Sequence, residues 1–405
     1  MDSDIVQPIT TQEKHRGKEP AIHKYFRAMV KTNASDLHLK ADSVPRLRLK
    51  TKIVPVKGDP LSAEELFNMA MEILDERQRE FFDKYGSIDV ADELEGSDRF
   101  RINIFRQRGK VSIAARRVSR NIPTFEELHL PDQIRKIAEH TSGLVLLAGI
   151  TGAGKSTTIA AMLEHINQTR PCHIVTIENP IEYLYTDKKA IINQREVGID
   201  VPDFSSALKY LMREDPDVVL IGEMRDRETF AAALQAAETG HLVFGTIHAS
   251  GAAQTIGRIL DLFEPASRDL VRQSLGFNLR AIIYQQLLPC LVEGIERVPA
   301  VEILLNNPSA RQMIEQGRDA ELPTVIRSSQ HEGMKDFTYS LLELIEKDYV
   351  DPKVAYEAAP NPDELKMLLS GISTSQTGLR SKSVSYTHLR AHETSLHLVC
   401  RLLLE

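Results

Sequence analysis

A glycine-rich segment, residues 149–156, has the residue types and spacing that most directly indicate chemistry. Its sequence, GITGAGKS, fits the pattern G-x-x-x-x-G-K-[ST]. Glycines let the main chain turn its amide groups inward around phosphate oxygens, and the N-terminus of the helix predicted next adds partial positive charge. Lys155 is expected to reach the β- and γ-phosphates, and the Ser156 hydroxyl to ligate Mg²⁺. The predicted nucleotide-binding residues are Gly149, Ile150, Thr151, Gly152, Ala153, Gly154, Lys155, Ser156 and Thr157.

Two acidic residues follow apolar runs that read as buried strands. Glu223 comes just after residues 218–221, and Glu182 ends the segment ENPIE that follows a strand predicted at residues 173–177. In a parallel sheet the carboxyl ends of the strands face the ligand, so both acids should reach the phosphate loop. Glu223 could bind the metal through water, and either acid could polarise the attacking water in hydrolysis. The alternative, two solvated loop acids, stays open.

Two histidines flank a further strand predicted at residues 242–246. His248 lies just past its end, on the expected ligand edge, where it could contact a γ-phosphate. His241 precedes the strand. A single histidine is more often structural, so both interpretations remain open for each residue.

The elements that position these residues begin near residue 132, where predicted strands alternate with helices. This alternation favours a mostly parallel sheet covered by helices on both faces. A long helix is expected from residue 267 into the 280s, and residues 299–369 are expected to be mainly helical. We therefore predict an α/β fold over residues 132–371, with a helical C-terminal part.

A smaller α+β domain is predicted over residues 21–118. Ser62 and Glu65 form an S-x-x-E capping box that opens a helix, Gly86 ends a second helix, and a hairpin turns at residues 107–109. Two prolines mark a linker over residues 119–131, and residues 1–20 are expected to be a disordered extension.

Residues 372–405 are interpreted as a tail that is not native to the protein. They are rich in Ser, Thr and His without a clear period, and they resemble translated sequencing-adapter sequence. A metal site at His388, His392 and His397 is the alternative.

Composition excludes several classes of protein. The 405 residues contain 42% hydrophobic and 26% charged residues, and no apolar run has a membrane-spanning length. The start is polar, which argues against a secretory signal. A net charge of −7 argues against a general nucleic-acid coat. Three separated cysteines predict neither a disulfide framework nor a structural zinc site, and they favour the cytosol.

Four segments together resemble the motifs of secretion-type ATPases (the GspE, PulE and VirB11 type). GITGAGKST, TIENPIEY, REDPDVVLIGEMRD and AAETGHLVFGTIHAS are similar to the Walker A, Asp, Walker B and His boxes of that group. The twitching-motility, or pilus-retraction, ATPases of the PilT and PilU type are most similar. ASDLHL and INQREVG, which start at Ala34 and Ile192, also fit this family.

The resemblance implies a PAS-like N-terminal domain and a RecA-like motor domain, assembled as a homohexamer that hydrolyses ATP with Mg²⁺. It implies Glu182 as the general base or water-orienting residue, Glu223 as the Walker B acid, and both histidines as sensors of nucleotide state. Arg101 and Arg116, with Arg99 as a third candidate, would reach a nucleotide site; a solvated basic strand face is the alternative.

The resemblance also implies a place in the cell. The motor would lie at the cytoplasmic face of the inner membrane, attached only through partners. These would be an inner-membrane pilus platform protein and a second retraction ATPase, with no nucleic acid.

Two departures from the family pattern limit these implications. Asn179 stands where the family has Asp, which puts a metal role there in doubt. The C-terminal retraction signature AIRNLI appears only as SARQMI at residues 309–314, which tilts the prediction toward the accessory PilU-like branch.

Rival interpretations are a pilus-assembly or type II secretion ATPase, a non-enzymatic hexamer subunit, and a DNA-handling RecA-like protein. The missing tetracysteine motif argues against the first, the intact acids and lysine against the second, and the negative charge against the third. A GTPase and an ABC-type ATPase are disfavoured because N-K-x-D and L-S-G-G-Q are absent.

Overall fold

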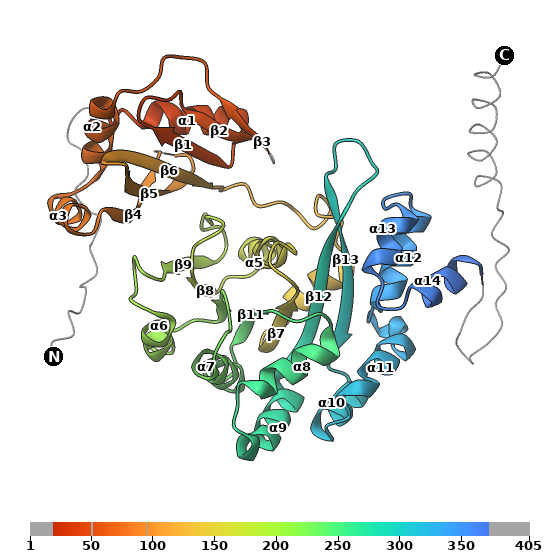
Figure 1. Ribbon diagram of the computed structural model, residues 1–405. Coiled ribbons are helices and arrows are strands. Elements are labelled where there is room, and N and C mark those ends of the chain that lie inside the picture. Colours follow the sequence, from red (N-terminus) through yellow and green to blue (C-terminus); the bar gives the residue numbers. More distant parts are fainter. Residues whose placement is uncertain (1–18, 50–51, 95, 372–405) are drawn as a thin grey trace, which may run out of the picture.

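The computed structural model describes residues 19–49, 52–94 and 96–371 and contains two β-sheets (Figure 1). Nearly all of the expected N-terminal extension, and the tail with its three histidines, lie outside the described residues. Within them, no helix is both long and apolar enough to cross a membrane.

The first sheet is antiparallel, with strand order β3-β2-β1-β6-β5-β4. Three helices and one face of the sheet enclose its apolar core, and the capping box expected at Ser62 begins the second of these helices. The hairpin expected near residues 107–109 joins β5 to β6. The elements are α1 His23–Thr32, β1 Asp36–Lys40, β2 Arg46–Leu49, β3 Lys52–Pro55, α2 Ala63–Ile73, α3 Glu76–Tyr85, β4 Ser87–Glu93, β5 Arg99–Gln107 and β6 Lys110–Val118.

The second sheet has the order β13-β12-β7-β11-β10-β8-β9, and all of its strands are parallel except β13. Strands β7 and β11 are buried along their whole length, as expected for parallel strands covered on both faces. The carboxyl ends of β7, β8, β10 and β11 therefore share one edge. The strands are β7 Gly143–Ala148, β8 His173–Glu178, β9 Ile191–Glu196, β10 Val218–Ile221, β11 Leu242–Ile247, β12 Leu279–Pro289 and β13 Arg297–Leu305.

Helices cover both faces of this sheet and enclose a separate apolar core on each. The helices up to β12 are α4 Asp132–Ala138, α5 Lys155–Thr169, α6 Phe204–Leu211, α7 Arg227–Glu238, α8 Ala252–Asp261 and α9 Arg268–Asn278, with a 3₁₀ turn at Pro265–Ser267. After β13 come α10 Pro308–Glu315, α11 Leu322–Ser328, α12 Phe337–Glu346, α13 Pro352–Ala358 and α14 Pro362–Leu369, with 3₁₀ turns at Asp319–Glu321 and Gln330–Glu332.

The long helix expected from residue 267 into the 280s is wrong. Helix α9 ends at Asn278, and Leu279 begins the strand β12 of 11 residues. The region expected to be mainly helical likewise opens with β13. Leu, Ala and Gln occur in buried strands and in helices, so the sequence of β12 does not decide between the two. Pairing with β7 and β13 makes this segment a strand.

The hairpin of β12 and β13 extends beyond the edge of the sheet (Figure 1). Strand β12 pairs with β7 only as far as Tyr284, opposite Ala148, and its later residues pair with β13 alone. This outer half packs against the C-terminal helices in a fourth core that includes Leu288, Val298 and Phe337.

Candidate active site

The phosphate loop joins the end of β7 to the start of α5, as predicted. Gly149, Gly152 and Gly154 have φ values of 148°, 79° and 85°, which favour glycine. Lys155 is 9% exposed, and its Nζ donates to the main-chain oxygens of Gly149 at 2.7 Å and Ile150 at 3.0 Å. Desolvation lowers the pKa of Lys155, and the charge of Glu223 opposes this shift. The ammonium group thus lies inside the loop, where a phosphate could replace its carbonyl partners.

Glu223 and His248 meet at the same edge, as predicted. Glu223 follows β10, which is separated from β7 only by β11, and its Oε1 accepts a hydrogen bond from Nε2 of His248 at 3.1 Å. Nε of Arg225 contacts the same oxygen. Burial favours the neutral acid, but Arg225 and His248 outweigh it and hold the pKa of Glu223 below its usual value. An ionised carboxylate is what ligation or water activation requires.

Glu182 lies at this edge too, after β8. Its side chain is exposed, and the hydroxyl of the next residue, Tyr183, lies 3.1 Å from Oγ1 of Thr157 in α5. The main-chain N–H of Glu182 donates to Oε2 of Glu178 at 3.4 Å. The two ends of the ENPIE segment therefore differ: Glu178 is buried, whereas Glu182 is exposed to solvent.

Burial makes the carboxyl group of Glu178 an unusually weak acid. It is 8% exposed and accepts hydrogen bonds from Thr176 at 2.8 Å and Gln194 at 3.3 Å. Burial raises the pKa of Glu178 to about 7, because these hydrogen bonds only partly compensate for lost solvation.

The structure does not bring the expected arginines to the phosphate loop of their own chain. Arg101 Nε lies 3.3 Å from Oε1 of Glu196 at the end of β9, and Arg99 Nη2 lies 3.7 Å from its Oε2. Strand β9 is four strands from β7, a separation of about 19 Å. Arg116 pairs instead with Asp36, at 2.9 Å.

His241 also lies away from the loop. It precedes β11, and its carbonyl accepts a hydrogen bond from the N–H of Gly143 at the first residue of β7. Six residues of β7 separate this edge from the loop, about 20 Å. Within one chain, His241 therefore does not lie beside the phosphate loop, and its expected role at a nucleotide stays a prediction.

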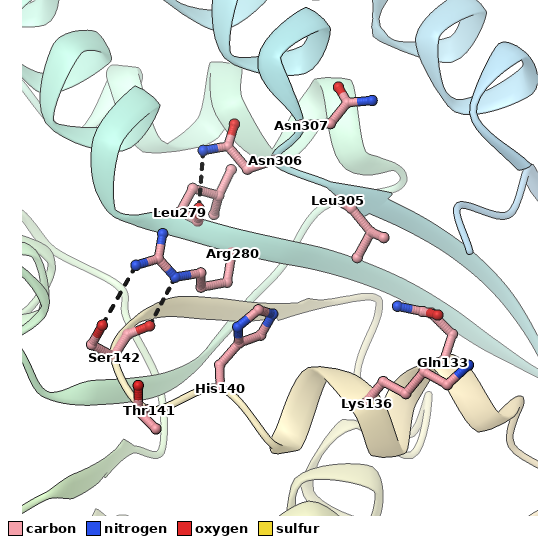
Figure 2. Close-up of a pocket in the computed structure, with 10 residues that line it drawn as sticks. All are labelled: Gln133, Lys136, His140, Thr141, Ser142, Leu279, Arg280, Leu305, Asn306 and Asn307. Atoms are coloured by element: carbon pink, nitrogen blue, oxygen red, sulfur yellow. Dashed lines mark hydrogen bonds between the residues drawn. The ribbon is translucent and has the colours of Figure 1, made fainter. Parts of the chain in front are cut away.

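A hollow of about 640 Å³ opens at this opposite edge, between α4 and the start of β12 (Figure 2). Lys136, His140 and Arg280 contribute to its lining, and Arg280 donates to the main-chain oxygen of Ser142 at 2.9 Å. No residue expected to act on nucleotide lines this hollow.

The donors at the loop edge fit a hydrated magnesium ion. Ser156 presents an exposed hydroxyl in the first turn of α5, and Glu223 supplies a carboxylate with a depressed pKa nearby. Magnesium usually keeps several waters and takes one or two protein oxygens together with phosphate oxygens. Ser156 directly, and Glu223 through water, could supply them.

Sequence reasoning missed three residues that contact expected site residues or neighbour them. Arg225 touches Glu223 and stands in the recognised segment GEMRD, so its proximity was available as a signal. Glu196 contacts Arg99 and Arg101 of the N-terminal domain. It ends the edge strand β9, whose mixed polarity gives no clear signal in the sequence. Gln285 donates to the Ala153 carbonyl in the loop, and the sequence does not reveal this contact because it predicts a helix where β12 lies.

A family model described as "Type II/IV secretion system protein" matches residues 100–337, more than half of the chain. The chain belongs to this family. The motifs of the chain therefore place the chain among the secretion ATPases. The resemblance of the sequence to secretion-type ATPases is confirmed.

Similarity to individual secretion ATPases extends over most of the chain. It is 39% identical over 333 residues to "Type IV pilus retractation ATPase PilT" of Pseudomonas aeruginosa, covering 82% of this chain and 96% of that protein. It is 38% identical over 346 residues to "Type IV pilus ATPase PilU" of the same organism, covering 85% and 90%. The crystal structure of the pilus retraction motor PilT with bound ADP matches with a TM-score of 0.79 at 40% identity, covering 86% of this chain and 99% of that one.

These matches confirm the expected fold class, an N-terminal domain followed by a RecA-like ATPase domain, and the expected ATPase activity.

Proposed function

We propose that this secretion ATPase is the ATP-driven motor that retracts type IV pili in twitching motility. The observation that carries the proposal is the shared sheet edge, where Lys155, Glu223 and His248 gather, in a chain whose match to PilT covers 82% of this chain and 96% of PilT.

Hydrolysis follows from what these side chains can do. Phosphate oxygens would take the place of the carbonyls now bound by Lys155, while the loop amides and the N-terminus of α5 add positive potential. Glu182 or Glu223 would orient the attacking water, and His248 would follow the γ-phosphate through its hydrogen bond to Glu223. Mg²⁺, when bound, supplies charge neutralisation at the phosphates, and Ser156 and Glu223 would hold it.

Retraction would require assembly into a ring. Arg101 and Arg116 lie away from the loop of their own chain, so a neighbouring subunit or a rotation of the N-terminal domain would have to bring them to a nucleotide. Contacts between unlike surfaces of identical subunits close a ring when the rotation closes, and the homohexamer that the family resemblance implies would be such a ring. The force would pass to an inner-membrane platform protein at the cytoplasmic face of the membrane, without nucleic acid.

An accessory, PilU-like role is the alternative, with a second retraction ATPase as partner. The weak match of residues 309–314 to the retraction signature favours it, and that segment lies in α10. Identity does not separate the branches, because PilU and PilT match at 38% and 39%.

Pilus dynamics in a deletion strain test the proposal. We expect surface pili to accumulate and twitching to stop, with rescue by the wild-type gene but not by Lys155→Ala. A strain without pili would indicate an assembly ATPase instead. Retraction that persists with a second ATPase present, and is lost without it, would support the accessory role.

A further inference from the structure

The side chain of Gln285 lies buried beneath the phosphate loop. It is only 2% exposed, and it comes from β12 just after that strand's last pair with β7. Its Nε2 donates to the carbonyl oxygen of Ala153 at 2.8 Å, and its Oε1 accepts from Oγ1 of Thr158 at 2.8 Å. Because a main-chain carbonyl can only accept, these two partners fix which way the amide points. One amide group thus ties the end of the loop to the first turn of α5.

The glycines of the loop are matched to the same residue. A Cβ atom on Gly149 would lie 2.5 Å from the main-chain oxygen of Gln285, and one on Gly154 would lie 2.7 Å from its Nε2. Contacts this short would force Gln285 to shift, so the close approach of β12 reinforces the requirement for glycine that the positive φ at both positions already sets. The loop therefore passes close to Gln285 at two points in addition to its hydrogen bond.

We propose that Gln285 is a positioning residue for ATP hydrolysis, acting through the phosphate loop without touching nucleotide. A phosphate-binding loop must point its N–H groups inward and keep its carbonyl oxygens from facing the phosphates. Gln285 holds the Ala153 carbonyl on the side of β12. When that bond is lost, the carbonyl is free to turn toward the β-phosphate, and the ring of loop amides loses its preorganised shape.

A purely structural role for Gln285 gives a different experimental result. If the amide only satisfied buried polar groups, its loss would lower stability and leave the folded protein with normal preferences among ligands. If Gln285 positions the loop, losing its amide weakens the binding of a nucleotide more strongly when the loop contacts more of that nucleotide's phosphates. The ratio of AMP to ADP dissociation constants isolates that contribution.

The test compares Gln285→Met with the control Gln286→Met in the full chain. Methionine keeps the length of the side chain and removes both hydrogen bonds. Gln286 is the next residue of the same strand, points to the other face, and accepts from the hydroxyl of Tyr284 at 3.3 Å. Dissociation constants for ADP and AMP are measured by calorimetry, together with kcat, KM and the melting temperature.

We expect Gln285→Met to reduce the preference for ADP over AMP and to lower kcat, each by about tenfold, because small misplacements of binding groups carry large kinetic costs. Gln286→Met should change neither. An unchanged preference and kcat in folded Gln285→Met would overturn the proposal.

Thr158→Val provides a second variant if Gln285→Met does not fold. Valine has nearly the shape of threonine and removes only the hydroxyl bond to Oε1. We expect a smaller loss of ADP preference in the same direction. Where Gln285→Met does fold, a double variant should be no worse than Gln285→Met alone, because the two residues act as one unit. Additive losses, or no loss in Thr158→Val, would contradict the proposed linkage.

Discussion

Replacing Glu178 with glutamine should change how the stability of the protein depends on pH. The carboxyl group is buried at the end of β8, and burial raises its pKa from 4.5 to about 7. A raised folded-state pKa means that the unfolded chain loses its proton first as pH rises. The wild-type protein therefore loses stability between about pH 4.5 and pH 7, and the neutral glutamine does not.

The size of the effect follows from the two pKa values. A difference of one between the folded and unfolded pKa corresponds to about 1.36 kcal/mol, so the full penalty above pH 7 is about 3 kcal/mol. Less than about 1 kcal/mol of it is already present at about pH 5. The stability of Glu178→Gln relative to wild type should thus rise by about 2 to 3 kcal/mol between about pH 5 and about pH 8.5. Altered hydrogen bonds to Thr176 and Glu182 add an offset that does not depend on pH.

Urea unfolding followed by circular dichroism at both pH values measures this difference. Glu182→Gln is a comparison variant, because that exposed carboxyl group lies four residues away and its charge contributes least to the raised pKa of Glu178. Its stability difference from wild type should change with pH far less than that of Glu178→Gln. A Glu178→Gln difference that is equally flat would refute the reasoning, because it would mean that Glu178 ionises in the folded protein as it does in the unfolded chain.

Four further predictions concern the site itself. Lys155→Ala should fold normally and show only background ATP turnover, and normal turnover in a folded variant would contradict the assignment of the loop. Glu182→Gln and Glu223→Gln should retain nucleotide binding and lose roughly 10²-fold in turnover, whereas equal losses in both would indicate structural roles. Arg101→Ala and Arg116→Ala should lower ATP turnover more than nucleotide binding. Mixing either variant with Lys155→Ala should restore some activity if the arginine acts across an interface between subunits. Turnover that does not depend on protein concentration, with no rescue on mixing, would place a complete site in one subunit. His241→Ala should leave ADP affinity unchanged in dilute protein, and weaker binding there would argue against its location at the opposite edge.

Local signals in the sequence predicted the elements whose boundaries depend on neighbouring residues. Helix α2 begins with a capping box at Ser62, and α3 ends at Gly86 with φ of 74°, both as expected. The strands that support the loop and Glu223 are short apolar runs buried on both faces, which sequence pattern identifies well.

Elements stabilised by distant partners were harder to predict. Strand β12 pairs with β7, which is remote in sequence, as well as with β13, which follows it in a hairpin, and its own residues do not indicate that the preceding helix ends at Asn278. Strand β9, with the sequence IINQRE, lies at the edge of the sheet and lacks an apolar pattern. The contact of Arg101 with Glu196 joins residues of different sheets, and nothing in their local sequence indicates it.

The histidines show how strand direction could have refined the site. His241 and His248 flank the same strand, and in a parallel sheet only the residue at its carboxyl end can face the loop. The structure brings His248 to Glu223 and leaves His241 at the other edge.

The outer half of the β12–β13 hairpin is joined to the rest of the sheet at one end only. That end, its support, is the pair of Tyr284 with Ala148 next to the phosphate loop, and the C-terminal helices pack on the outer half. The overhang of β12, residues 285–289, is about 17 Å long, so a tilt of about 3° at the support moves the tip by about 1 Å. A small tilt at the support would therefore be larger at the tip, where the C-terminal helices pack on the hairpin.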